Sequence, residues 1–411
     1  MAPEATGPAG AQSVSVRGVD TNALPPPPPA ARRRGAVLAC PHRPPCPGCP
    51  RFGEHGIAPE ARATLNELAR THGLEPVTVI SGATSGFRLR VRLAIRGRVG
   101  SPKLGLFETG THHVVHIPSC LVHHPLINQV AAIVRGALAD ARVSCYSDRA
   151  RLGLARYLQV VIERSSQTAQ VVLVGRCATA APLAECLELI RTRLGAALHS
   201  LWFNANLEAT NTILGPYFER WCGPESVIES FGGSEVHYPP GAFGQSNLEI
   251  AQDLIDELRG QIPPGATVAE FYAGVGAIGL SVLEQASCVH MNELAPQSLY
   301  GLGLGVAALD EIRRARTRVV PGAAGAACEL AANAQVVIAD PPRKGLDEAL
   351  TQRLASQPPQ RLLYVSCGLD SLLRDTLLLC AGGRLRLSSL KVFNLLPFTT
   401  HVETVARFER A

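Results

Sequence analysis

The chain has 411 residues, enough for two or three domains at roughly 100–200 residues each. Hydrophobic residues make up 46% and charged residues 18%, which excludes a chain that is disordered throughout. No apolar run approaches the roughly 20 residues needed to span a bilayer, so a membrane protein is excluded too. The net charge of +5 permits an acidic partner without requiring one.

Twelve cysteines raise the question of a secreted disulfide scaffold. A chain of this length can bury a large core without disulfides, and its N-terminus lacks the apolar stretch of a signal peptide. We therefore expect a cytoplasmic protein that uses some of its cysteines for metal binding or catalysis.

The first 39 residues are rich in Ala, Gly, Pro and Ser, and this composition predicts a disordered tail. Their few acidic residues leave an organellar transit peptide as the alternative. A second segment, residues 40–125, begins with closely spaced cysteines, and its spacing of Ala and Leu predicts a helix over 58–72.

Residues 87–96 alternate strictly between apolar side chains and arginines, which predicts a strand with two different faces. An arginine-rich strand face is suited to binding RNA phosphates, and the alternative is an ordinary solvated face. The arginines of this face are Arg88, Arg90, Arg92 and Arg96.

Residues 126–235 are predicted to form a central domain. Strand-like runs at Tyr157–Glu163 and Gln170–Gly175 precede an amphipathic helix near 181–196, and another strand follows at Ser200–Asn204. This order is typical of an α+β domain with an antiparallel sheet.

From residue 236 to 411 the pattern becomes a regular alternation of helices and short apolar strands, which predicts a doubly wound α/β sheet. A helix at Leu248–Arg259 leads to a strand at Thr267–Tyr272, a glycine-rich turn and a second helix. Because no helix separates the last two strands, we expect the sheet to end in an antiparallel hairpin. The remaining predicted strands are Val289–Asn292, Arg318–Val320, Gln335–Ala339, Arg361–Ser366, Leu385–Phe393 and Val402–Phe408.

The glycine-rich turn contains Gly274, Gly276 and Gly279, and Glu293 stands at the end of the next strand. This arrangement fits a dinucleotide site, in which glycines allow close approach and the acid binds the ribose hydroxyls. S-adenosylmethionine has the same ribose diol, so the motif alone leaves both cofactors open. A nicotinamide-dependent dehydrogenase is therefore one reading, and a purely structural turn is another.

Chemistry-bearing residues follow two later strands. Asp340 begins the segment Asp-Pro-Pro-Arg, and Cys367 follows the next strand. Because the carboxyl ends of the strands line the ligand crevice of such a sheet, these residues should meet the glycine turn there. A thiolate that adds to carbon 6 of uracil makes carbon 5 nucleophilic, and a base must then remove the proton from carbon 5. Cys367 is the candidate nucleophile and Glu403 the candidate base.

With these segments in this order, residues 40–410 resemble the RNA 5-methyluridine methyltransferase family (the RlmC, RlmD and TrmA type). The matching motifs are Phe243-x-Gln245-x-Asn247, the glycine turn, Asp340-Pro-Pro-Arg343, Ser366-Cys367 and His401-x-Glu403. The resemblance implies a C-terminal Rossmann-like methyltransferase domain, with Cys367 as nucleophile and Glu403 as base. It also implies S-adenosylmethionine contacts at Gln245, Tyr272, Glu293 and Asp340, beside Gly274 and Gly276 of the turn.

The chain departs from the family at four positions. Glu270 and Asn394 each stand where an Asp is usual, and Leu396 replaces a usual Phe. Gly368 replaces the Asn that usually follows the cysteine, so a side-chain contact is missing there. These changes bear on substrate positioning more than on the reaction.

Cys40, Cys46 and Cys49 lie close together in the sequence, and Cys120 follows much later. From the residues alone, four such thiolates suit either an iron–sulfur cluster or zinc. The resemblance implies a 4Fe-4S cluster, because members with this spacing carry one. We expect five histidines near Cys120 to be polar surface and the other seven cysteines to be core residues.

The chain is too short ahead of Cys40 for the TRAM domain of some members, which places it closest to the iron–sulfur, TRAM-less, RlmC-like members. The resemblance therefore implies a uridine of 23S rRNA as the target, with the tRNA uridine that TrmA modifies as the alternative. A non-catalytic iron–sulfur RNA-binding protein is the reading from another class. Arg343 is predicted to contact the RNA, and the protein is predicted to act as a monomer.

Overall fold

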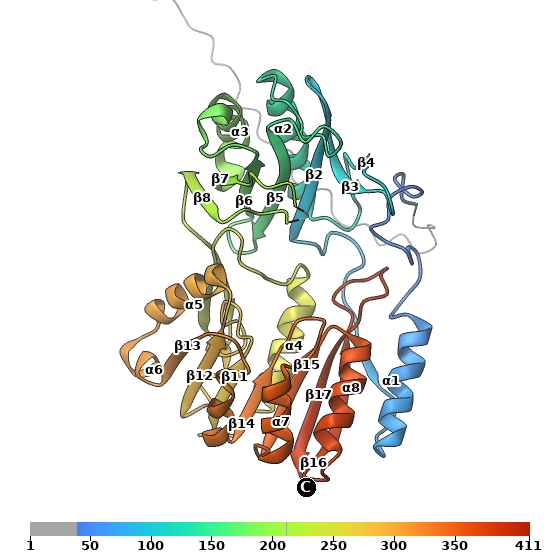
Figure 1. The fold of residues 1–411 in the computed structure, drawn as a ribbon, viewed down its shortest axis with the longest axis vertical. Helices are drawn as coiled ribbons and strands as arrows, with labels where there is room; N and C mark the ends of the chain where they lie inside the picture. The colour runs from blue at the N-terminus through green and yellow to red at the C-terminus, as the bar shows by residue number, and fades with distance from the viewer. Residues whose placement is uncertain (1–38, 211) are drawn as a thin grey trace, which may run out of the picture. The chain divides into compact units, whose positions relative to one another are not determined.

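The structure is a computed structural model that describes residues 39–210 and 212–411 (Figure 1). The predicted N-terminal tail therefore lies outside the described residues, except for its last position. None of the described helices is long and apolar enough to cross a membrane.

The C-terminal part of the chain builds an eight-stranded sheet in the order β1-β16-β17-β15-β14-β11-β12-β13. Neighbouring strands are parallel except where β17 pairs with β15 and with β16. The predicted doubly wound sheet and its terminal hairpin are thus confirmed. The strands are β11 (Thr267–Phe271), β12 (Cys288–Glu293), β13 (Thr317–Pro321), β14 (Val336–Ala339), β15 (Arg361–Ser366), β16 (Leu385–Phe393) and β17 (Glu403–Arg410).

Helices cover both faces of this sheet because its buried strands are apolar on both sides. On β11, for example, Val268 faces one core with α4, whereas Phe271 faces the other with α1, α7 and α8. Both side chains are almost completely buried, and each such burial contributes about 1.5–3 kcal/mol. The helices are α1 (Pro59–Thr71), α4 (Leu248–Gly260), α5 (Pro296–Ala308), α6 (Glu311–Ala315), α7 (Glu348–Ser356) and α8 (Leu369–Cys380).

The helix predicted directly after the glycine-rich turn is wrong. Only a short 3-10 turn, Leu280–Val282, forms between β11 and β12. The glycines are the physical reason: Gly274 and Gly276 have φ of 58° and 84°, which a right-handed helix cannot contain. At Gly279 a β-carbon would lie only 2.2 Å from the Glu270 carboxylate, so this glycine permits close packing.

An early segment of the chain completes the C-terminal sheet. The three-residue strand β1 (Thr78–Ile80) pairs in parallel with β16, and α1 packs into the same core as α8 (Figure 1). The predicted domain boundary at residue 236 therefore needs correction. The methyltransferase-like sheet is formed from two parts of the chain, and the central domain is inserted between them.

The central domain is a seven-stranded sheet in the order β4-β3-β2-β5-β6-β7-β8, with α2 and α3 packed on one face. Its pairs are antiparallel apart from β6 and β7, which confirms the α+β prediction. A hairpin of β9 (Val227–Phe231) and β10 (Ser234–Tyr238) leads back to α4. The other elements are β2 (Arg90–Arg98), β3 (Ser101–Phe107), β4 (Val114–His116), α2 (Pro125–Asp140), β5 (Ala155–Glu163), β6 (Thr168–Gly175), α3 (Ala184–Leu194), β7 (Leu198–Ala205) and β8 (Tyr217–Cys222).

Candidate active site

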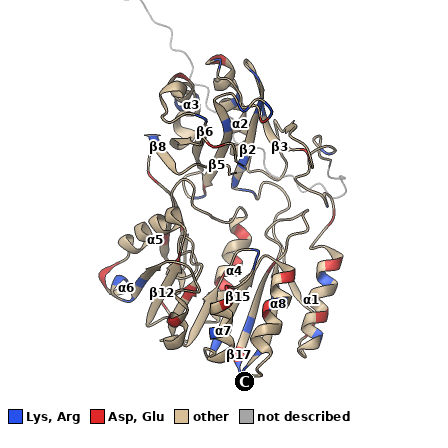
Figure 2. Ribbon diagram, viewed as in Figure 1, with Lys and Arg blue, Asp and Glu red and all other residues tan. Residues whose placement is uncertain are grey.

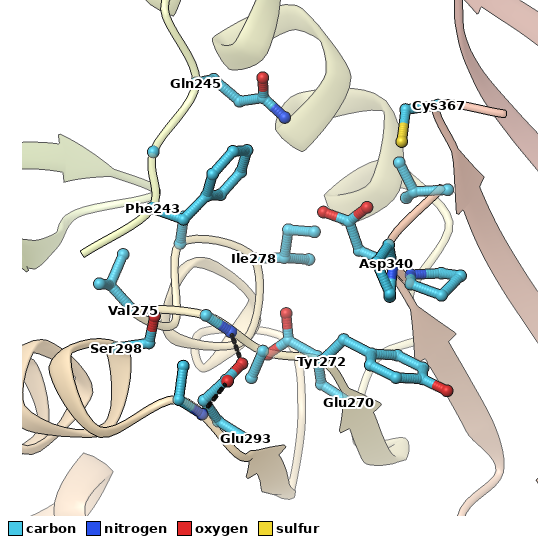
Figure 3. Close-up of a pocket in the computed structure, with 18 of the residues that line it drawn as sticks. Phe243, Gln245, Glu270, Tyr272, Val275, Ile278, Glu293, Ser298, Asp340 and Cys367 are labelled. Atoms are coloured by element: carbon cyan, nitrogen blue, oxygen red, sulfur yellow. Dashed lines mark hydrogen bonds between the residues drawn. The ribbon is translucent and has the colours of Figure 1, made fainter. Parts of the chain in front are cut away.

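A cavity of about 1070 Å³ opens at the carboxyl ends of β11, β12, β14 and β15. The strand order reverses between β11 and β14, and this reversal point is where open α/β sheets bind ligands. Figure 3 shows Cys367 and Asp340 on one side of the cavity, across from Phe243 and Gln245. The sequence prediction that these segments converge is confirmed.

The pairing of β15 with β17 brings Cys367 next to Glu403. In this antiparallel pair Ser366 lies opposite Thr404, so the residue after Ser366 lies opposite the residue before Thr404. A hydrogen bond from the Thr404 hydroxyl to the Ser366 carbonyl, 3.2 Å long, fixes this register at the edge of the cavity. Asp340 follows the neighbouring parallel strand β14 and lines the same cavity.

Burial raises the pKa of Cys367, of Asp340 and of Glu403. Burial and the neighbouring charges of Glu403 and Asp340 raise the pKa of the Cys367 thiol to about 11, while Arg343 acts in the opposite direction. Burial also raises the pKa of Asp340 to about 7, and burial together with the Asp340 charge raises the pKa of Glu403 well above its usual value. Two buried carboxyls beside each other cannot both ionise easily, so the pair retains a proton near neutral pH.

The glycine turn is held by the acid predicted to face it. One Glu293 carboxylate oxygen accepts a hydrogen bond from the Gly274 amide at 2.7 Å, and the other accepts bonds from the Leu294 and Ala295 amides (Figure 3). The oxygen that accepts from Gly274 keeps further acceptor capacity for a ligand, whereas the other already accepts two bonds. Glu293 therefore both shapes the turn and presents an acceptor to the cavity.

Tyr272 and Glu270 lie just before the glycine turn and differ in how far they are exposed to solvent. Tyr272, with φ of 60°, turns the chain after β11, and its hydroxyl accepts a hydrogen bond from the Asp347 amide at 2.9 Å. Tyr272 and Asp347 both line the cavity. Glu270 is 1% exposed, one of its carboxylate oxygens has no partner among the described residues, and burial raises its pKa well above normal. Burial thus favours the neutral form of the Glu270 carboxyl.

Phe243 and Gln245 sit on a loop that is clamped to β2 of the central domain. The Arg90 guanidinium donates to the Ala242 carbonyl at 2.9 Å, and the Leu89 amide donates to the Ser246 carbonyl at 2.8 Å. The loop leaves Phe243 66% exposed beside the cavity. Sequence reasoning missed this role of Arg90, because alternation along a strand does not reveal what covers each face.

Figure 2 marks basic positions along β2, but their side chains form the predicted arginine face only in part. Arg92 is exposed, but Arg96 is buried and binds Asp148 through two bonds of 2.7 and 2.9 Å. The guanidiniums of Arg88 and Arg90 also turn inward, each with a buried Nε atom that has no partner within the described chain. The expectation of four arginines directed to solvent is therefore wrong for Arg88, Arg90 and Arg96, because neighbouring segments cover them.

Arg343 lies at the mouth of the cavity. It is exposed, and its guanidinium approaches both ring nitrogens of His401, at 3.2 and 3.1 Å. Lys344 is also exposed beside it and lines the cavity. Sequence reasoning assigned no role to His401, which stands in a quoted motif, or to Lys344, which directly follows one. The mouth of the cavity is thus positively charged.

The predicted cluster cysteines come together from two segments. The thiols of Cys40, Cys46 and Cys120 are close enough to Cys49 to raise its pKa, which burial brings to about 11. Within residues 39–210 and 212–411, however, no three His, Cys, Asp or Glu side chains are arranged as a metal site. The structure therefore gathers the four thiols in one place without defining a ligand geometry.

Known proteins are similar to this chain in sequence and in fold. A family model described as tRNA (Uracil-5-)-methyltransferase matches residues 328–411. A relative from Protochlamydia amoebophila, named as an uncharacterized RNA methyltransferase, is 34% identical over 382 residues, covering 91% of this chain and 98% of the relative. Another RNA methyltransferase so named, from Geobacter sulfurreducens, is 28% identical over 90% of this chain and 77% of its own length.

The crystal structure of a Pyrococcus abyssi tRNA (uracil-54, C5)-methyltransferase in complex with S-adenosyl-L-homocysteine has the same fold. The TM-score is 0.70 at 21% identity, over 85% of this chain and 83% of that one. At 21% identity this likeness shows the fold, and the named relatives together with the family model show the class, an S-adenosylmethionine-dependent methyltransferase. The chain belongs to the family of RNA methyltransferases that includes the Protochlamydia amoebophila relative, and its last 84 residues match the tRNA (Uracil-5-)-methyltransferase model. This membership supports S-adenosylmethionine, rather than a nicotinamide dinucleotide, as the cofactor.

Proposed function

We propose that this enzyme methylates carbon 5 of a uridine in RNA through a covalent bond between Cys367 and the uracil ring. The observation that carries the proposal is the β15–β17 register, which brings Cys367 and Glu403 together in the cavity, beside Asp340. A nucleophile and a base at one place are what this reaction requires.

The proposed reaction has a defined order of bonds. The Cys367 thiolate adds to carbon 6 of the uracil, and carbon 5 thereby becomes nucleophilic. When bound, S-adenosylmethionine supplies an electrophilic methyl group to carbon 5. The Glu403 carboxylate then takes the proton from carbon 5, the bond between carbons 5 and 6 becomes double again, and the Cys367 sulfur leaves carbon 6.

The electrostatics of the site support a division of roles between the acids. The raised pKa of Glu403 makes its ionised form a strong base for a carbon-bound proton. Asp340, which shares this environment, retains a proton more easily than an exposed Asp and can hydrogen-bond the edge of the uracil or the cofactor. Arg343 favours the Cys367 thiolate and is also placed to meet an RNA phosphate at the mouth.

The residues around the glycine turn fit the methyl donor, S-adenosylmethionine. We propose that Glu293 binds the ribose hydroxyls, that Gly274 and Gly276 allow close backbone approach, and that Gln245 and Tyr272 complete the site. The cavity is large enough for this cofactor and a flipped base together, since ligand pockets usually measure about 300–1,000 Å³. The target uridine must leave its stack to reach Cys367, which favours a loop or single strand.

We also propose that Cys40, Cys46, Cys49 and Cys120 hold a 4Fe-4S cluster. Their four thiols share one location, and thiolates are the ligands that such clusters use. A cluster there would join two distant segments of the chain. Its test is the iron and sulfide content of anaerobically purified protein, with a colourless protein that holds stoichiometric zinc contradicting it.

For the substrate, we propose a uridine of 23S rRNA, with Arg92 and Arg343 contacting the RNA. We also propose that the enzyme is a monomer that acts in the cytoplasm. A transfer RNA is the second candidate, because the structural neighbour from Pyrococcus abyssi acts on uracil 54 of tRNA. Methyl transfer to each purified RNA, followed by mapping of the methylated nucleotide, separates the two candidates.

The covalent step is tested with RNA that contains 5-fluorouridine. Fluorine cannot leave carbon 5 as a proton does, so the enzyme and the RNA should remain joined in the presence of S-adenosylmethionine. The adduct is visible as a shifted band on a denaturing gel, and Cys367→Ala should abolish it. A missing adduct with the native enzyme, or an unchanged adduct with Cys367→Ala, would sink the proposed mechanism.

A further inference from the structure

The segment with the three N-terminal cysteines contacts the loop that leads to Glu403. We define the cysteine segment as residues 40–57 and the base loop as residues 394–402, between β16 and β17. Phe398 of the base loop packs in one small apolar cluster with Phe52, Cys49 and Cys120. The rings of Phe52 and Phe398 lie 5.1 Å apart, and the Arg51 amide donates to the Phe398 carbonyl at 2.9 Å.

Phe398 has an unusual conformation for its residue type. Its φ of 66° lies in the left-handed region, where a residue with a β-carbon pays roughly 1–2 kcal/mol. Its side chain is nevertheless only 1% exposed. Such a conformation persists only where surrounding contacts determine it, and here those contacts come from the cysteine segment and from Phe87 and Val122.

The base loop has few other anchors between Phe398 and Glu403. The Asn394 amide donates to the Ile80 carbonyl at 2.8 Å near the start of the loop. After Phe398, the hydrogen bonds of the loop's own backbone amides are local, such as that from the His401 amide to the Thr399 hydroxyl at 3.2 Å. The loop's other contacts here are those of the His401 ring with Arg343 and of the buried Val402 side chain. The turn at Phe398 therefore sets the path by which the chain reaches Glu403, five residues later.

We propose that Phe398 is a positioning residue through which the cysteine segment fixes Glu403 for proton removal. We call the contact between Phe52 and Phe398 the latch. This inference rests on the proposed function, because it assigns the latch to one step of that reaction. Phe398 and Phe52 do not line the part of the cavity formed by β11, β12 and the glycine turn. Loosening the latch should therefore slow the removal of the carbon 5 proton while the cofactor still binds.

The test uses Phe52→Leu and Phe398→Leu in the full-length protein, with Phe408→Leu as the matched control. Phe408 lies on the same strand as Glu403 and is fully buried. It belongs to a different apolar cluster from Phe52 and Phe398. Single-turnover reactions on ordinary RNA are run on denaturing gels, and cofactor affinity is measured by calorimetry. Folding of each variant is checked by its melting temperature.

If the latch positions Glu403, both latch variants accumulate a covalent Cys367–RNA adduct on ordinary RNA, which the native enzyme does not. Turnover falls about 10- to 100-fold, the cost expected when a base is displaced by about 1 Å. The dissociation constant for S-adenosylmethionine changes less than twofold. Phe408→Leu lowers the melting temperature without trapping adduct.

Two results would overturn the inference: slower turnover with no adduct on ordinary RNA, or a Phe52→Leu variant that turns over like the native enzyme. The 5-fluorouridine experiment separates this failure from failure of the proposed function. If the native enzyme forms that adduct but the latch variants trap nothing on ordinary RNA, the reaction stands and only the latch is wrong.

Discussion

The raised pKa of the Cys367 thiol predicts a steep dependence of the first chemical step on pH. With a pKa of about 11, roughly one thiol in 1,000 is ionised at pH 8, and each further pH unit increases the thiolate tenfold. The thiolate is the species that adds to carbon 6. The rate constant for adduct formation should therefore rise about 100-fold between pH 7 and pH 9.

RNA that contains 5-fluorouridine isolates this step, because the later removal of a proton cannot occur. The adduct is followed in rapid-quench reactions at saturating RNA and S-adenosylmethionine, over short times that limit RNA hydrolysis. Arg343→Met removes the positive charge that favours the thiolate, so its profile should lie at higher pH, whereas Arg343→Lys should keep the native profile.

A change of less than threefold between pH 7 and pH 9 would refute this reasoning. It would mean that the thiol is already ionised at neutral pH, or that a neighbouring base takes its proton within the same step. An Arg343→Met profile that coincides with the native one would show that this arginine does not act on Cys367.

Three further predictions concern the surroundings of the site. The pKa of Asp340 is raised to about 7, so the folded chain holds this proton more tightly than the unfolded chain does. The stability that the proton contributes is complete below about pH 4 and is lost as the pH rises through 7. The melting temperature of Asp340→Asn should therefore rise relative to that of the native protein from pH 5 to pH 8, and an equal difference at both pH values would contradict this. Arg90→Lys should weaken S-adenosylmethionine binding about tenfold, because it loses a charged hydrogen bond to Ala242 worth about 1.5 kcal/mol, while Arg92→Lys should bind the cofactor normally in the same calorimetry. At Gly368 a β-carbon would lie 2.8 Å from the Arg343 carbonyl, so Gly368→Asn should lower kcat/KM about tenfold, and a gain in kcat/KM would instead show that an amide contact is missing there.

The sequence predicted the chemistry at the strand ends well. Asp340 and Cys367 follow apolar runs that could only be buried strands, and the carboxyl ends of such strands meet at one edge. The antiparallel final hairpin was readable from the missing helix between its two strands. These features depend on local patterns, which a sequence displays directly. The pairing of β17 with β15, which brings Glu403 to Cys367, was not readable in this way.

What could not be predicted depends on contacts between distant segments. Nothing in the alternation of residues 87–96 shows that Asp148 covers Arg96 or that Ala242 accepts from Arg90. The contact of Phe52 with Phe398 joins residues far apart in the chain without any periodic signal. The three-residue strand β1 is too short to show an alternation, so its place in the sheet was invisible.

Strand β1 also has a consequence for how the protein is made. Its partner β16 is synthesised about 310 residues later, which at roughly 5–20 residues per second is about 15–60 s of translation. During that interval α1 and β1 have no sheet to join, and the apolar face of α1, including Leu65 and Leu68, stays uncovered. The inserted central domain can fold first, whereas α1 and β1 find their place in the C-terminal core only when the last strands emerge.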